Sequence, residues 1–517
     1  MLNVGRDRFC SPCGYFNAAT REIRARKTDS DLTGVLFMVF SSLIFLYLFL
    51  PLNLIAYFIA RDIKQKNTVM LVFSLIFYAW GEPVYIILLV GMTFIDWYLS
   101  LHIALNRKNR KKAKLFLALA VTADLLLLGI FKYGTFFLQN LRLISGFPKN
   151  IPNIILPIGI SFYTFQLITY CVDVYRSDAR AQRSFKTLLL YVSMFHQCVA
   201  GPIVRYKDIA AELENRRAGY GDIAEGLNRF SVGLAKKALI ANTCAAVADS
   251  LLAADGGDMS VLASRSVLSL WVGMLAFAIQ IYADFSAYSD MAIGMGRMIG
   301  IHYTENFNYP YTARSVSDFW RRWHITLGSF FRDYLYIPMG GNRRGGLRTV
   351  LNLLIVWALT GLWHGASWNF VLWGLYFFVF ISFEKLFLGK LLKRNRAASH
   401  VYLLFVIFFG WVLFKFENTG DIWCVLKGMF GANGNKFSDF ETLTNVKSYI
   451  GILAVGTVAS TPLVKKISEK IKYTALRSGK ALALYSGLQL TLPALLIILS
   501  TAALVGNTYN PFLYFRF

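Results

Sequence analysis

Apolar stretches alternate with short polar segments along most of this chain. Charge-poor runs occupy residues 36–60, 115–131, 154–170, 270–282, 351–383, 401–414 and 482–505. Several of them approach or exceed the roughly 20 apolar residues that an α-helix needs to cross a bilayer. The pattern therefore predicts an all-α polytopic membrane protein with about ten or eleven transmembrane helices.

The run at residues 351–383 is too long for one perpendicular crossing. About 33 residues at a rise of 1.5 Å make roughly 50 Å, against a hydrocarbon core of about 30 Å. Both flanks are basic, with Arg348 before the run and Lys385 after it. Two shorter helices that meet near Gly361–Gly365, with both outer ends cytoplasmic, fit this pattern. A single strongly tilted helix is the alternative.

The middle of the chain is less regular. Residues 186–204 are apolar but short and end in Ala200-Gly201-Pro202, which favours a re-entrant helix. Such irregular backbone is tolerated at membrane depth only where protein or a water-filled cavity covers it. Residues 205–226 carry mixed charge and predict a solvated or interfacial cytoplasmic helix, and residues 301–350 carry seven arginines among aromatic residues.

Composition agrees with a membrane protein and excludes an ordinary soluble enzyme, since 56% of the residues are hydrophobic and only 16% are charged. The net charge of +25 suggests a nucleic-acid partner, but its placement does not. Basic clusters lie between apolar runs, as expected for cytoplasmic loops of a membrane protein. We therefore expect contact with membrane lipid and no nucleic-acid partner. Binding of anionic lipid or of an anionic cytosolic ligand is the alternative role for these basic residues.

The first 37 residues do not fit the topology, because their basic residues would lie outside. The first apolar run opens at Met38. We expect Met38 to be the natural start, residues 1–37 to be an upstream extension, and residues 38–517 to form a single transmembrane domain. A disordered, translocated tail is the alternative. Cys10 and Cys13 have CxxC spacing, but without a second cysteine pair nearby they predict no metal site.

Two of the six histidines are candidate catalytic residues. His364 is the only ionisable side chain, tyrosines apart, between residues 351 and 383, where it stands in GLWHGASW. A titratable group in such a run is a functional-site hypothesis, and a buried histidine bonded to a carbonyl is the alternative. His324 ends a segment of arginines and tryptophans. Among the others, His102 and His400 are expected at interfaces, His302 in a turn and His196 in the core or a pocket.

Other catalytic signatures are missing from the sequence. It has no GxSxG elbow, Walker loop, metal-ligand histidine cluster or paired-carboxylate motif. If the chain is an enzyme, a histidine must transfer the proton. Asp284 and Asp290 lie about 240° apart around a helix, so each is expected to bind a loop or to pair with an arginine separately. Asp173 and Arg176 are expected to act in the same way.

A group of aromatic and basic residues lies between residues 320 and 332, before the apolar run at 351–383. Guanidinium and aromatic groups together suit recognition of phosphates and rings. Snorkelling of the arginines at the cytoplasmic interface is an equal alternative. The group consists of Trp320, Arg321, Arg322, Trp323 and Arg332.

Several short motifs follow one another in order over residues 38–517. They are GISFYTFQ at 159–166, VAGPI at 199–203, DFSAYSD at 284–290, NFNYPY at 306–311, FWRRWH at 319–324, FRDYLYIP at 331–338, WHG at 363–365 and the tail at 509–517. Together they resemble the membrane-bound O-acyltransferase family, and in particular the bacterial branch of alginate O-acetylation proteins. The D-alanyl transfer proteins of teichoic acids are similar more distantly.

The resemblance implies a helical fold around a central pore or funnel, with a catalytic core at about residues 154–383. It implies that His364 is the catalytic histidine and His324 a second polar site residue. The activity would carry an acyl group, most simply acetyl, from a cytosolic thioester such as acetyl-CoA or an acyl carrier to a hydroxyl. No permanently bound cofactor or metal is implied.

The same resemblance implies a place and partners for the reaction. The protein would lie in a bacterial inner membrane and modify an exported or cell-surface polysaccharide. A single-span or secreted esterase-like partner would finish the transfer outside. The group of Trp320, Arg321, Arg322, Trp323 and Arg332 would bind the anionic acyl donor. A non-catalytic transporter or channel with intramembrane histidines and aspartates is the alternative, although no internal repeat supports it.

Overall fold

The computed structural model describes residues 38–148, 150–152, 154–198, 201–252, 259–477 and 479–506. The expectations for residues 1–37 and for the tail at 509–517 lie outside this part of the chain. Every regular element within it is a helix, which confirms the all-α prediction.

The first half of the chain contains short and medium helices. They are η1 (Phe45–Phe49), α2 (Leu50–Ile59), α3 (Ile63–Gly81), α4 (Ile86–Leu105), α5 (Arg110–Leu128), η2 (Gly129–Tyr133), α6 (Gly134–Ser145), α7 (Ile160–Arg176), α8 (Phe185–Ser193), α9 (Tyr206–Glu214), α10 (Tyr220–Ala235), η3 (Lys236–Ala241), α11 (Asn242–Leu252) and α12 (Met259–Ser264).

The second half begins with the longest helix. Its elements are α13 (Val267–Met298), η4 (Pro310–Thr312), α14 (Val316–Arg322), α15 (Ile325–Phe330), η5 (Phe331–Tyr336), α16 (Gly346–His364), α17 (Trp368–Phe383), η6 (Glu384–Leu388), α18 (Gly389–Arg394), α19 (Arg396–Lys415), α20 (Thr419–Met429), α21 (Phe440–Ala459), α22 (Leu463–Ala475) and α23 (Gly479–Gly506).

Eight helical segments among the described residues are long and apolar enough to cross a membrane, so the chain is a multi-pass membrane protein. A ninth is added if α21 and α22, which meet at a 64° bend, form one span. The predicted ten or eleven spans exceed this count, and the apolar helical segment Phe45–Ile59 is too short to be counted with them. The eight are Ile86–Leu105, Arg110–Ser145, Tyr220–Leu252, Val267–Met298, Gly346–His364, Trp368–Arg394, Arg396–Lys415 and Gly479–Gly506.

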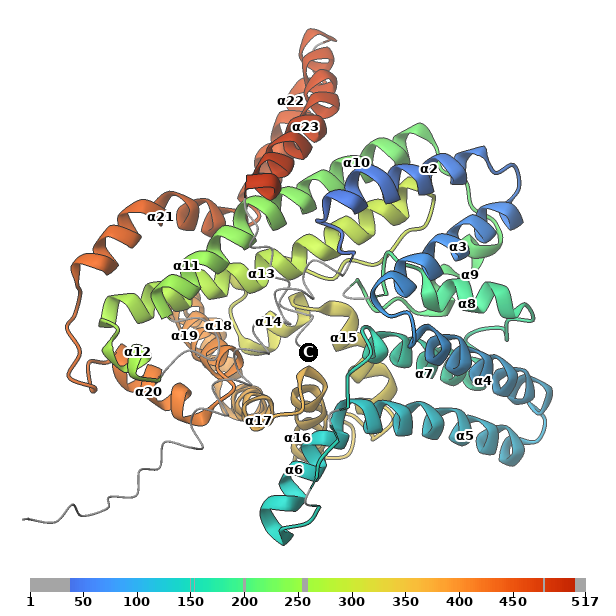
Figure 1. Cartoon of the computed structure of the whole chain (residues 1–517), viewed down its shortest axis with the longest axis horizontal. Helices are drawn as coiled ribbons and strands as arrows, with labels where there is room; N and C mark the ends of the chain where they lie inside the picture. Colours follow the sequence, from blue (N-terminus) through green and yellow to red (C-terminus); the bar gives the residue numbers. More distant parts are fainter. Residues whose placement is uncertain are drawn as a thin grey trace, which may run out of the picture.

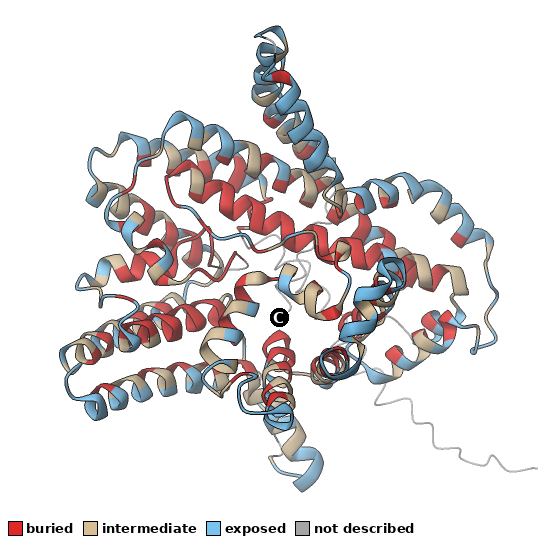
Figure 2. Ribbon diagram, turned by 180° about the vertical axis from the view of Figure 1, so that it is seen from behind, coloured by how far each residue is buried: buried red, intermediate tan, exposed pale blue. Residues whose placement is uncertain are grey.

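The helices surround a central region in which α14, α15, α16 and α17 meet (Figure 1). Helices α10, α11 and α13 lie along one side of this region, and α4, α5 and α7 lie on another (Figure 1). Helix α13 is buried over most of its length, whereas α22 and α23 project from the body and are largely exposed (Figure 2). The core therefore follows α13 and the elements around the central region.

Buried ion pairs join η3 to α13. Lys237 lies 2.7 Å from Asp284, and both side chains are almost completely buried. The adjacent Lys236 lies 2.6 Å from Asp290, which also binds Arg229 at 2.7 Å. The two carboxylates thus act separately, as the helical spacing predicted, but Asp284 pairs with a lysine and not with an arginine. Asp173 likewise binds Lys207 at 3.1 Å, while Arg176 donates to the Asp333 carbonyl at 3.3 Å.

The predicted re-entrant segment is short and irregular. Helix α8 ends at Ser193, and residues 194–198 continue without regular structure although they are buried. Protein therefore covers this backbone, as its position in an apolar protein requires.

The long apolar run is broken where the sequence predicted. Helix α16 ends at His364, residues 365–367 are not helical, and α17 begins at Trp368. The single tilted helix is therefore wrong. The two helices pack very closely, because a Cβ atom on Gly361 would lie 2.3 Å from the Phe370 carbonyl oxygen, and one on Gly374 would lie 2.4 Å from the Trp357 carbonyl oxygen. Small residues allow such close approach between membrane helices.

Gly361→Ala should destabilise the protein by about 1–3 kcal/mol, because the added methyl group forces α16 away from α17. Thermal unfolding in detergent measures this loss. The control is Gly91→Ala on α4, where a Cβ atom meets nothing within 4 Å. The control should melt like the wild type or slightly higher. Equal melting of the two variants would contradict the close-packing account.

Candidate active site

His364 is the last residue of α16 and is buried, with 2% of its surface exposed. Aromatic rings surround its imidazole. The ring centroids of Trp363 and Trp373 both lie 4.8 Å away, and that of Phe414 lies 5.4 Å away. These rings come from α16, α17 and α19. The imidazole is therefore enclosed by side chains among the described residues.

His324 lies at the junction of α14 and α15 and is also buried. Its backbone has φ of +46°, a left-handed conformation that is unfavourable for a residue with a side chain. Asn306 stabilises this junction, since its backbone carbonyl accepts from the amide of Ile325 at 3.0 Å. Strained backbone of this kind persists only where the surrounding structure fixes it, and it is frequent at functional sites.

The hydrogen bonds of Asn306 determine the tautomer of His324. The side-chain oxygen of Asn306 lies 3.1 Å from His324 Nδ1 and accepts from the Thr326 hydroxyl at 2.9 Å. The Asn306 amide nitrogen donates to Ser289 at 3.1 Å. Since the neighbouring atom of Asn306 is an acceptor, Nδ1 carries the proton, and Nε2 has the lone pair.

The Nε2 atom of His324 has no hydrogen-bond partner among the described residues. Burial lowers the pKa of His324 to about 3, so the ring is neutral at physiological pH. A neutral, buried imidazole with an unused lone pair is available to accept a proton or a hydrogen bond from a ligand.

The two predicted histidines come together around one tryptophan. The Trp363 ring lies 5.7 Å from the His324 ring and 4.8 Å from the His364 ring. Residues 40 positions apart in the sequence thus share one buried site.

The sequence analysis missed a lysine at this site. Lys132 in η2 is buried, donates to the Trp363 carbonyl, and approaches the Ser161 hydroxyl at 3.4 Å. Its Nζ also lies 5.6 Å from the centre of the Trp363 ring. The available signal was one lysine directly after the apolar run at 115–131, which we did not distinguish from a flanking charge.

The aromatic members of the predicted donor-binding group pack in or against the protein core, with Trp323 buried and Trp320 half-buried. Trp320 packs against Trp373 with centroids 5.4 Å apart, and the buried Trp323 stacks on Phe319 at 5.5 Å.

The arginines of that group have other surroundings. Arg322 pairs with Asp318 at 3.0 Å, and Arg332 pairs with Asp333 at 2.6 Å. Arg321 and Arg332 are exposed and remain accessible to a ligand. The structure thus does not bring the five residues together with the histidines as one donor site, and their role stays a prediction.

The remaining four histidines contact other residues. His302 binds Glu212 at 2.9 Å, and His196 lies 3.3 Å from the Tyr303 hydroxyl. His102 packs against the Phe116 ring, and His400 lies 3.0 Å from the Ala313 carbonyl. Each therefore has a local contact that accounts for it.

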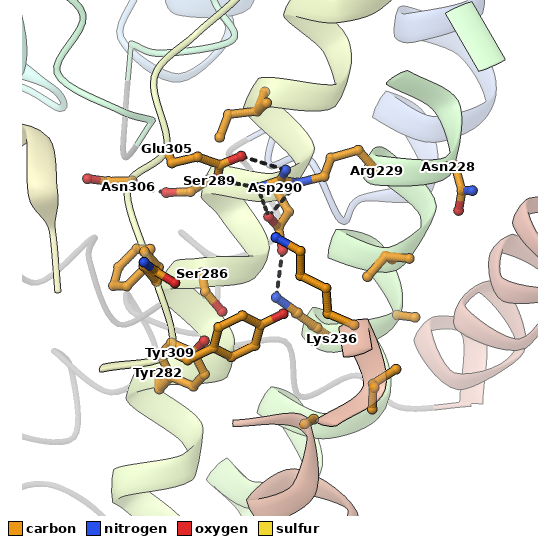
Figure 3. Close-up of a pocket in the computed structure, with 18 of the residues that line it drawn as sticks. Asn228, Arg229, Lys236, Tyr282, Ser286, Ser289, Asp290, Glu305, Asn306 and Tyr309 are labelled. Atoms are coloured by element: carbon orange, nitrogen blue, oxygen red, sulfur yellow. Dashed lines mark hydrogen bonds and ion pairs between the residues drawn. The ribbon is translucent and has the colours of Figure 1, made fainter. Parts of the chain in front are cut away.

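A pocket of about 1120 Å³ lies between α10, η3, α13, the loop at residues 302–309 and the α21–α22 bend. Its polar wall is an ion network in which Arg229 binds Asp290 and Glu305, and Lys236 binds Asp290 (Figure 3). The lining reaches Asn306 but includes neither His324 nor His364. Asn306, which contacts the His324 ring, is thus also part of the pocket wall.

Comparison with known families decides how this site is classified. Residues 47–419 match the family model of the membrane-bound O-acyltransferases. The chain belongs to this family. The matched segment contains both histidines, Lys132 and the central helices. Because the members of this family are acyltransferases, the chain is an enzyme that transfers acyl groups.

Individual relatives agree. The chain is 35% identical to the probable alginate O-acetylase AlgI of Azotobacter vinelandii, over 93% of this chain and 100% of that protein. It is 36% identical to the peptidoglycan O-acetyltransferase of Helicobacter pylori, over 78% and 82% of the two chains. The teichoic acid D-alanyltransferase of Bacillus subtilis is more distant, at 26% over 51% and 68%.

Asn306→Ala should lower the acyl-transfer rate by about 10–100-fold, because His324 loses the acceptor that fixes its tautomer. The control is Ser289→Ala, which removes only a partner of the Asn306 amide and should lower the rate less than about three-fold. Initial rates of the purified variants measure both effects. Equal rates for the two variants would show that the orientation of His324 does not matter.

Proposed function

We propose that this acyltransferase moves an acetyl group from a cytosolic thioester, such as acetyl-CoA or an acyl carrier, toward O-acetylation of an exported or cell-surface polysaccharide. The observation that carries the proposal is the convergence of His324 and His364 on Trp363 inside the segment that matches the family. The names of the relatives support acetyl as the group and a surface polymer as the acceptor. A bacterial inner membrane is the corresponding location.

In the proposed reaction, His364 is the general base. It takes the proton from the attacking hydroxyl as the oxygen bonds to the thioester carbonyl carbon. Collapse of the tetrahedral intermediate breaks the carbon–sulfur bond, and the proton passes from the imidazolium to the departing thiolate. The products are an ester and a free thiol, so no oxidant or metal is required.

The surroundings of His364 suit acyl transfer better than hydrolysis. Rings of Trp363, Trp373 and Phe414 cover the imidazole and keep bulk water from it. Exclusion of water protects a reactive acyl donor from side reactions. Because these rings enclose the imidazole, at least one of them must move before the reactants can reach it.

His324 has a separate part in the proposal. Its protonated Nδ1 is held by Asn306, so its Nε2 is available as a hydrogen-bond acceptor. It can orient a hydroxyl group toward His364 across Trp363. The exposed Arg321 and Arg332 are the members of the predicted donor group that remain available to an anionic donor. An esterase-like partner outside the membrane would complete delivery to the polymer.

His364→Ala should lower transfer of radiolabelled acetyl groups from acetyl-CoA by about 10²–10⁴-fold, since the general base is lost. The control is His102→Ala, whose ring stacks on Phe116 and has no part in the proposed reaction. It should keep wild-type activity.

Equal amounts of each variant in the membrane must be verified by immunoblotting. Full acetyl transfer by His364→Ala would remove the proposed mechanism. Loss of transfer in both variants would assign the effect to folding rather than to proton transfer.

No observation favours the transporter or channel that the sequence analysis left open.

A further inference from the structure

Helix α16 ends inside the protein, and this end needs partners. The last four carbonyl groups of a helix have no donor within the helix. Trp363 and His364 are buried, so water cannot replace the missing donors. The residue that follows, Gly365, has extended backbone and does not continue the helix.

Two consecutive residues of η2 supply donors to this helix end. The Lys132 ammonium donates to the Trp363 carbonyl, and the Tyr133 hydroxyl donates to the Leu362 carbonyl at 2.9 Å. Their segment is a π-helical turn between α5 and α6. Such turns insert an extra residue into a helix and are frequent at functional sites.

Lys132 is unusual for a buried lysine. Within the described part of the chain, no carboxylate lies within ion-pair distance of its Nζ. All of its polar contacts are at the site, namely the Trp363 carbonyl, the Trp363 ring and the Ser161 hydroxyl. A cation at the C-terminal end of a helix is also favoured by the helix dipole. The helix end thus substitutes for a counter-ion.

We propose that Lys132 is a positioning residue for the acyl-transfer reaction, which fixes the C-terminal end of α16 and thereby the place of the His364 imidazole. Tyr133 assists it at the neighbouring carbonyl. The inference rests on the proposed role of His364. It adds that the geometry of this imidazole depends on a donor from a helix that is distant in sequence. Misplacement of a reacting group by about 1 Å can lower a rate by about 100-fold.

The test measures acetyl transfer by purified, full-length Lys132→Met, which keeps the length of the side chain but removes the donor. Its kcat should fall by about 30–100-fold while KM for the thioester stays within about three-fold, since donor binding is unaffected. Lys132→Gln, which keeps an N–H donor, should recover most of the lost rate. The control is Lys114→Met, an exposed lysine at the other end of the same helical segment, which should match the wild type.

Either of two results would overturn the inference: Lys132→Met with kcat within about two-fold of the wild type, or equal losses for the Met and Gln variants. If Lys132→Met does not purify as folded protein, Tyr133→Phe decides, because it removes only one hydroxyl group. Its kcat should fall by about 3–10-fold at unchanged KM, and an unchanged kcat would refute the inference.

The outcomes also distinguish this inference from the proposed function. An inactive His364→Ala with an active Lys132→Met would refute only the positioning role. An active His364→Ala would refute the function itself.

Discussion

A helix that ends inside a protein exposes carbonyl groups that its own turns cannot satisfy, and α16 ends in this way at His364. An unsatisfied buried carbonyl costs about 1–3 kcal/mol, so the fold must bring donors to this point. Lys132 and Tyr133 meet two of these carbonyls. The close contact of Gly361 with α17 holds the same helix from another side. The position of the imidazole therefore follows from how this end is satisfied.

The second histidine depends on a different kind of support. His324 adopts a left-handed backbone conformation, and one asparagine bonds both its ring and the amides that follow it. That asparagine also lines the pocket beside α13. One imidazole is thus placed by the end of a helix and the other by a polar loop, and the Trp363 ring lies against both. Rigid support from two independent elements suits a site whose geometry must be held closely.

Much of the fold could be predicted from the apolar runs along the chain, and His324 and His364 could be singled out from the residues next to them in the sequence. The length of the run at 351–383 predicted a break, and a histidine among glycines located it, because both signals lie within one stretch of chain. Lys132 could not be found in this way. Its partner is 231 residues away, and a single lysine after an apolar run looks like a charge that ends a membrane span. The number of membrane spans could not be predicted from the lengths of the apolar runs either. Short helices, and bent ones such as the α21–α22 pair, do not match the length of a single straight crossing.

The central claim is that the acyl group is transferred beside His364. An electron cryo-microscopy structure with acetonyl-CoA, in which a methylene group separates the carbonyl from sulfur, tests it most directly. We expect the ketone carbon about 4–5 Å from an imidazole nitrogen of His364, which leaves room for the attacking hydroxyl between them, with the covering aromatic rings displaced. An analogue bound elsewhere, with the Trp363, Trp373 and Phe414 rings still closed over His364, would contradict the account.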